Sequence, residues 1–201
     1  MKPIIKKLLR KSLMSENLIT PPNIEGTRNF WHGGNLDEYS DVIAQKNGRY
    51  EFGSGLYLTT QYDIAKKYSK GSRKLYIVTV KLGNDINDSL IKTNDAIEFV
   101  KKYSVSAKRK EIIQYLTSYD KEGYVKAYLF NNMLINHKAI KPSNTRILRQ
   151  FLVDNNIDYE IINNAFGFGE DMMVLYNMNK IVKTTIFGPK DRMDDYNFEN
   201  K

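Results

Sequence analysis

The sequence predicts an α+β fold, and three observations support this class. Short runs rich in β-branched and aromatic residues, which are typical of strands, lie near both ends of the chain. Between them, residues from about 93 to 155 place apolar side chains every three to four positions, as amphipathic helices do. Hydrophobic residues make up 41% of the 201 residues and charged residues 27%, a composition typical of a globular protein.

The first part of the chain is expected to contain three strands and two short helices. The strands are predicted at residues 28–32, 56–59 and 74–82, and the last of these should be central because it is rich in β-branched residues. One short helix is expected at 36–46. Thr60 is predicted to cap the start of the second helix, and Gly71 to close its end.

The helical stretch is followed by three more predicted strands, at 159–162, 172–177 and 181–187. The helical groups are Ala96/Ile97/Val100, Ile112/Ile113/Leu116, Tyr124/Tyr128/Leu129 and Ile147/Leu148/Phe151/Leu152. The expected organisation is one domain at 26–190 with a helical insertion at about 93–155. A basic amphipathic helix or arm at 1–20 precedes it, and an acidic, frayed tail at 191–201 follows.

The charge balance and the absence of cysteine limit the class of protein. Lys and Arg number 31 against 23 acidic residues, so the surface should attract polyanions or acidic partners. Without cysteine there is no disulfide, and a reducing cytoplasm fits best. The N-terminal segment lacks the uninterrupted apolar run of a signal peptide, and no stretch has the length of a membrane span.

Three local motifs carry the functional interpretation. They are Phe30-Trp31-His32-Gly33-Gly34, then Gly53-Ser54-Gly55-Leu56-Tyr57-Leu58-Thr59-Thr60 with Tyr68 downstream, and finally Gly169-Glu170-Asp171-Met172-Met173-Val174-Leu175-Tyr176. In this order, the motifs resemble the His-Tyr-Glu class of ADP-ribosyltransferases. That class includes diphtheria-toxin-like toxins, poly(ADP-ribose) polymerases and PARP-like domains of bacteria and phages. The resemblance covers about 28–82 and 159–187.

The resemblance implies two small antiparallel sheets packed around a cleft that holds NAD as substrate. It assigns a ribose hydroxyl contact to His32 and the nicotinamide site to Tyr57 and Tyr68, whose aromatic faces attract a cationic ring. Gly33 has no side chain, so its backbone is expected to hydrogen-bond the carboxamide. Gly55 and Thr59, beside Tyr57, complete the expected NAD-binding set.

A carboxylate is expected beside the ribose, because cleavage of the nicotinamide bond builds positive charge on the sugar. The candidates are Glu170 and Asp171, and strand alternation favours Glu170 because it shares a face with Met172 and Tyr176. The family pattern places the acid about four residues before an aromatic, which here falls on Met172. A bulge or a shifted strand start would restore one of the acids, and if neither acid points into the pocket the domain would bind NAD without turning it over.

The predicted activity is transfer of ADP-ribose to a macromolecule, with a protein favoured over a nucleic acid. The alternatives are a degenerate NAD-binding or nucleic-acid-binding module, an NAD glycohydrolase and an RNA 2′-phosphotransferase. No metal is expected, because two histidines and no cysteine do not suit zinc, and His137 has no acid near it in sequence. Lys101-Lys102 and Lys108-Arg109-Lys110 form either a solvated helix face or a docking surface, on which Tyr103 and Tyr115 stack with bases.

Overall fold

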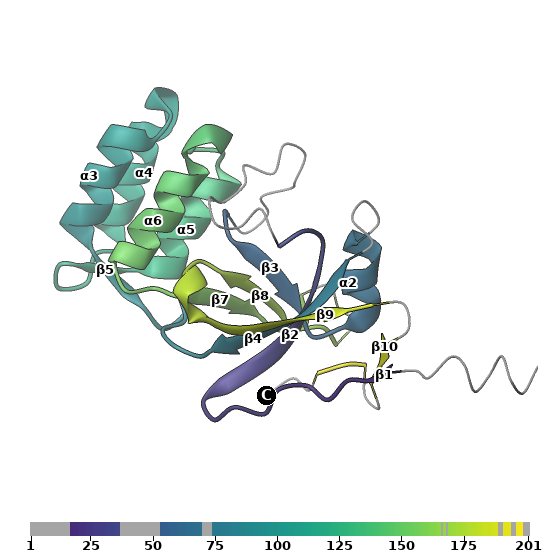
Figure 1. The fold of residues 1–201 in the computed structure, drawn as a ribbon. Helices are drawn as coiled ribbons and strands as arrows, with labels where there is room; N and C mark the ends of the chain where they lie inside the picture. Colours follow the sequence, from purple (N-terminus) through teal and green to yellow (C-terminus); the bar gives the residue numbers. More distant parts are fainter. Residues whose placement is uncertain are drawn as a thin grey trace, which may run out of the picture. The chain divides into compact units, whose positions relative to one another are not determined.

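The structure is a computed structural model that describes residues 17–36, 53–69, 74–165, 167, 169–188, 191–193 and 196–198. These residues form two compact units. The first unit takes its described residues from Met1–Asn35, Thr59–Lys81 and Ile181–Lys201, and the second from Leu36–Leu58 and Leu82–Lys180. Figure 1 shows the elements of both units coloured along the chain.

The first unit is built on three antiparallel strands, β2 (Thr27–Gly33), β4 (Leu75–Lys81) and β9 (Ile181–Phe187). Strand β4 pairs with β2 over its whole length and with β9 on its other side, where the register shifts between Thr79 and Val80. Six of the seven β4 residues are buried. The prediction of a central strand here is therefore confirmed.

Helix α2 (Tyr62–Tyr68) packs against β2 in the same unit. Its N-cap is Gln61 and its C-cap is Ser69, so the prediction that Thr60 caps the helix is wrong. Thr60 is instead fully buried, and its backbone oxygen accepts a hydrogen bond from the amide of Phe198. The predicted C-cap at residue 71 lies outside the described residues, as does most of the helix expected at 36–46.

Both ends of the chain contribute to the first unit. Strand β1 (Asn17–Leu18) pairs in parallel with β10 (Asp191–Arg192), so these residues are neither a helix nor a frayed tail. Trp31 explains why the tail packs, because it stacks on Phe198 with 5.4 Å between ring centroids and donates a hydrogen bond to the backbone oxygen of Tyr196. Most of the arm expected at 1–20 lies outside the described residues.

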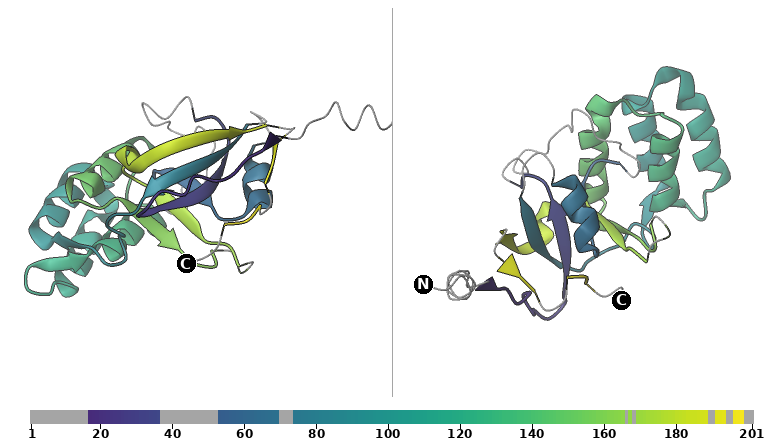
Figure 2. Two further views of the ribbon diagram at one scale, coloured as in Figure 1. Left: turned by 60° about the horizontal axis from the view of Figure 1, so that its bottom comes forward. Right: turned by 90° about the vertical axis from the view of Figure 1, so that its right-hand side faces the viewer.

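The described residues of the second unit include four helices, and Figures 1 and 2 show them side by side. Their apolar faces meet in a core that includes Phe99, Ile112, Phe130 and Leu148. The helices occupy the stretch in which the sequence predicted helical periodicity. They are α3 (Thr93–Tyr103), α4 (Ser106–Ser118), α5 (Ala127–Asn136) and α6 (Thr145–Asp154).

Strands β5 (Leu90–Lys92) and β6 (Tyr124–Lys126) pair as a small antiparallel sheet, and β6 separates α4 from α5. The prediction that Tyr124 belongs to a helix is therefore wrong. Glu122 and Gly123 both have positive φ, at 55° and 88°, and a helix cannot continue through such a turn. Short 3-10 turns, η2 (Pro142–Asn144) and η3 (Met178–Lys180), connect other elements.

Three further strands belong wholly or mainly to the second unit: β3 (Leu56–Thr59), β7 (Tyr159–Ile162) and β8 (Met172–Leu175). All three occur where the sequence predicted them. The strand order of the large antiparallel sheet is β7-β8-β3-β2-β4-β9. The α+β class is thus confirmed, although the described residues form one six-stranded sheet and two two-stranded sheets where the resemblance implies two packed sheets. No helix in the described part of the chain is long and apolar enough to cross a membrane.

Candidate functional site

His32 lies near the end of β2 in the first unit and is buried. The ladder places it opposite Tyr76 on β4, with 6.4 Å between the ring centroids. A Cβ at Gly34 would lie only 3.1 Å from the Nε2 atom of His32, so the ring rests against the Gly34 backbone. The imidazole is therefore held by its neighbours on two sides, and this restricts its orientation.

Gly33 is needed for packing in the first unit. A Cβ at this position would lie 1.8 Å from the backbone oxygen of Ala65 and 3.0 Å from the amide nitrogen of Ser69. The missing side chain thus makes room for the backbone of α2. The hydrogen bonds from Gly33 to a ligand, which the sequence resemblance implies, stay a prediction.

Tyr68 and Thr59, also in the first unit, differ in exposure. Tyr68 is the last residue of α2 and is 69% exposed, so it is not a packing residue of the core. Thr59 is buried at the end of β3, and its hydroxyl accepts a hydrogen bond of 3.0 Å from the amide of Gln61. Thr59 therefore shapes the turn that leads into α2, whereas the Tyr68 ring can contact a ligand.

Gly55 and Tyr57 lie in the second unit, at the start of β3. A Cβ at Gly55 would lie 2.6 Å from Cγ1 of Val174 and 2.8 Å from the backbone oxygen of Leu175, so β3 and β8 approach closely here. The half-buried Tyr57 side chain donates a hydrogen bond of 2.7 Å from its hydroxyl to the backbone oxygen of Gly53. This bond closes the glycine-rich segment onto the tyrosine ring.

The two candidate acids directly precede β8 and are buried, with Glu170 0% exposed and Asp171 3% exposed. Oδ1 of Asp171 accepts a hydrogen bond of 3.3 Å from the amide of Asn164. The backbone oxygen of Glu170 accepts one of 2.8 Å from the amide of Ala165. Asp171 thus uses its side chain to hold the β7–β8 hairpin, whereas Glu170 uses its backbone.

A buried polar cluster in the second unit was not predicted from the sequence. Glu160 on β7 is 5% exposed, and Oε2 of its carboxylate accepts a hydrogen bond of 2.8 Å from the hydroxyl of Tyr176. The side-chain amide of Asn131 on α5 donates to the same hydroxyl over 3.4 Å. Burial raises the pKa of the Glu160 carboxyl to about 7; the Tyr176 hydrogen bond lowers it and the charge of Asp85 raises it. The signal in the sequence that could have indicated this cluster is an acidic residue, Glu160, inside a short apolar strand.

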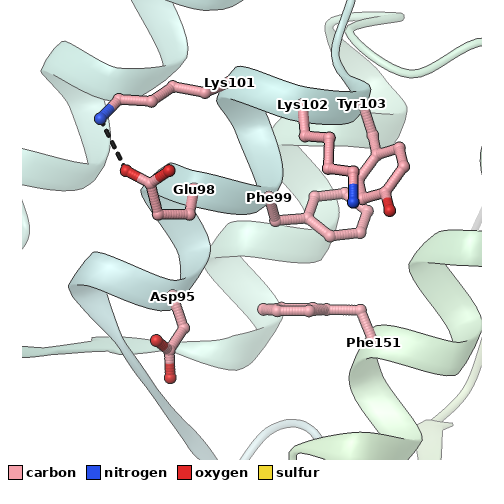
Figure 3. A pocket seen from close by; sticks show the side chains of 7 residues that line it. All are labelled: Asp95, Glu98, Phe99, Lys101, Lys102, Tyr103 and Phe151. Atoms are coloured by element: carbon pink, nitrogen blue, oxygen red, sulfur yellow. Dashed lines mark hydrogen bonds and ion pairs between the residues drawn. The ribbon is translucent and has the colours of Figure 1, made fainter.

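An open hollow of about 500 Å³, shown in Figure 3, lies beside α3 and α6 in the second unit. The rings of Phe99, Tyr103 and Phe151 line it, and Phe99 lies 4.6 Å from Phe151 and 5.0 Å from Tyr103 between centroids. Lys102 lies over the Tyr103 ring at 5.0 Å. Asp95, Glu98 and Lys101 also line the hollow, so charges of both signs surround it and do not select an anionic ligand.

The predicted docking surface on α3 and α4 is partly neutralised. Lys101 pairs with Glu98 at 2.7 Å and Lys108 with Glu111 at 3.1 Å, both through exposed side chains. Tyr115 lies 4.4 Å from Tyr119 between ring centroids. These pairs favour a solvated helix face, and the docking role stays a prediction.

His137 does have an acid nearby, which corrects the expectation from sequence. Its Nδ1 atom lies 3.4 Å from Oε1 of Glu111 on α4, because the end of α5 reaches that helix. Both side chains are exposed, as in a surface contact. Among the described residues there is no cluster of three or more His, Cys, Asp or Glu residues that could hold a metal ion.

Comparisons with known proteins identify no relative, so the function is argued from the residues of this chain alone. No family model, no curated protein and no solved structure matches the chain.

Proposed function

We propose that this protein is an NAD-dependent ADP-ribosyltransferase that transfers ADP-ribose to a macromolecule, with a protein favoured as acceptor. The main support is the close approach of the glycine-rich segment before Tyr57 to β8, the strand that follows Glu170, because a Cβ at Gly55 would lie 2.8 Å from the backbone oxygen of Leu175. A carboxylate in a site poor in water interacts more strongly with a developing positive charge than one in bulk solvent. The resemblance implies a Glu at the head of a late strand, and of the two candidates, Glu170 and Asp171, strand alternation favours Glu170.

The proposed reaction breaks the bond between C1′ of the ribose and the nicotinamide nitrogen. The electron pair of that bond goes to the nitrogen, which leaves neutral nicotinamide and a cationic ribose. A nucleophile of the acceptor then forms the new bond to C1′ and loses its proton. Glu170 stabilises the sugar cation, which is fully developed only near the transition state.

The remaining assigned residues bind NAD in this proposal. His32 contacts a ribose hydroxyl, and its fixed ring reduces the cost of ordering a side chain when NAD binds. Tyr57 and Tyr68 contact the nicotinamide, and the exposure of Tyr68 is consistent with a ring that stacks on a ligand. The net charge of +8 supports acceptors with acidic surfaces.

The test is incubation of the purified protein with NAD labelled on its adenylate part, together with a cell extract. The variants are His32→Ala, Tyr57→Ala and Glu170→Gln. Glu98→Gln is the matched control, because it removes the charge of a glutamate that is 70% exposed. We expect label on macromolecules with the wild type and with the control. Glu170→Gln should lower the rate about 100-fold or more, while NAD still binds.

Other outcomes would redirect the assignment. Release of free ADP-ribose without labelled macromolecules would indicate a glycohydrolase. Binding of NAD without its consumption would indicate a binding module. If Glu170→Gln kept the full rate, the proposed role of this carboxylate would be wrong.

A further inference from the structure

The Glu160 cluster continues toward the glycine-rich segment before β3. The side chain of Asn131 lies against Gly53, because a Cβ at Gly53 would be 3.5 Å from Oδ1 and 3.9 Å from Nδ2 of Asn131. The backbone oxygen of Gly53 accepts the Tyr57 hydroxyl bond of 2.7 Å. Contacts therefore run from the Glu160 carboxylate through Tyr176, Asn131 and Gly53 to the Tyr57 hydroxyl.

All of these residues except the half-buried Tyr57 are buried, so the polar groups of the cluster depend on their neighbours. Glu160, Tyr176 and Asn131 are all among the buried residues, and Tyr176 belongs to the core of the second unit. A buried donor or acceptor that loses its partner costs free energy, because no water replaces the bond. Gly53 has a φ of +93°, which favours glycine, so the segment has a defined backbone conformation for the cluster to act on.

We propose that Glu160 is a positioning residue that, through Tyr176 and Asn131, fixes Gly53 and with it the ring of Tyr57. The role in binding nicotinamide rests on the proposed function. The positioning itself does not, because every contact lies inside the second unit. Glu160 needs no contact with NAD for this role.

The charge state of Glu160 decides how the cluster is bonded. When the carboxylate is ionised it accepts from Tyr176, whose oxygen in turn accepts from Asn131. A proton on Glu160 leaves an oxygen that still accepts from Tyr176, but it removes the charge that strengthens this bond and adds a donor, so the hydrogen bonding of the cluster changes. Asp85 and Tyr176 interact electrostatically with Glu160, and Tyr57 with Tyr176.

Burial raises the pKa of Glu160 to about 7, so this change falls near neutral pH. The first experiment needs no NAD. The amide resonance of Gly53 is followed by NMR from pH 5.5 to 8.5 with selective ¹⁵N-glycine labelling. We expect a transition with a midpoint of about 7 in the wild type and in Glu98→Gln.

Glu160→Gln should abolish that transition, because glutamine keeps an acceptor oxygen for Tyr176 but does not titrate. A Gly53 resonance that stays constant in the wild type, or that still titrates in Glu160→Gln, would overturn the proposal. Failure of the wild type to consume NAD would refute the proposed function and leave this result intact.

The second experiment measures NAD kinetics. Glu160→Ala should raise KM for NAD about tenfold with little change in kcat, because the positioning of Tyr57 is lost while Glu170 remains. Glu160→Gln should restore KM to the wild-type value at pH 6, where the wild-type carboxyl is protonated and, like glutamine, is uncharged with one acceptor oxygen and a donor. A KM that stays raised in the glutamine variant, or an equal loss of kcat in both variants, would contradict a positioning role. Circular dichroism confirms that both variants are folded.

Discussion

Replacing Glu160 with glutamine should stabilise the protein at neutral pH. The ordinary pKa of the side chain is 4.5, and burial raises it to about 7 in the fold. Between these values the folded protein holds a proton that the unfolded chain has lost, so the wild type loses stability as pH rises through this window. The difference of about 2.5 pH units corresponds to about 3 kcal/mol at pH 7 and above.

The assay is urea unfolding of the wild type and of Glu160→Gln at pH 5, 6, 7 and 8. Glutamine retains an acceptor for the Tyr176 hydroxyl and has no charge to bury, so residue 160 should add no pH dependence to the stability of the variant. The free energy of unfolding of the variant, relative to the wild type, should rise by about 2.5 kcal/mol between pH 5 and 8. Parallel profiles for the two proteins would refute the reasoning, whereas Glu98→Gln should stay parallel to the wild type.

Three further predictions concern packing and charge. Gly33→Ala should lower the unfolding free energy by about 3 kcal/mol in urea, since its Cβ would overlap the backbone of α2; an unchanged value would mean that α2 is seated differently. Although burial opposes it, hydrogen bonds from Asn84, Asn177 and Lys180 lower the pKa of Asp158. Asp158→Asn should therefore lower the free energy of unfolding at pH 7. The difference from the wild type, measured by circular dichroism during acid unfolding, should disappear as the pH falls below 3.8. Tyr176→Phe removes the bond that lowers the pKa of Glu160, so ¹³C NMR of that carboxyl should show a higher pKa than in the wild type.

Local patterns predicted most elements, because strands and helices leave their periodicity in the sequence. β3, β7 and β9 occur at the predicted residues, and the helical stretch contains α3 to α6. The errors come from positions where backbone conformation or distant packing decides. The turn at Glu122 and Gly123 converts the next residues to a strand, and Trp31 orders a tail that charge alone suggested would fray.

The sequence predicted the type of each candidate residue and its order along the chain. It did not predict how deeply each residue is buried. The depth of Glu170 and the exposure of Tyr68 depend on tertiary packing that no local pattern records. The bond between Glu160 and Tyr176 joins residues 16 positions apart, and it requires the β7–β8 register that pairs Tyr159 with Leu175. A strand prediction without register cannot supply such a bond.

The participation of β9 and β10 in the first unit has a consequence for synthesis on the ribosome. The second unit takes its described residues from before residue 181, so all its helices can emerge and pack while translation continues. The first unit needs β9 beside β4, and these strands are separated by about a hundred residues, so it closes only after residues 181–187 have been synthesised and have left the ribosome. Until then the edge of β4 that pairs with β9 is exposed. A premature stop codon before β9 would leave this edge exposed permanently, and an unpaired strand edge favours aggregation.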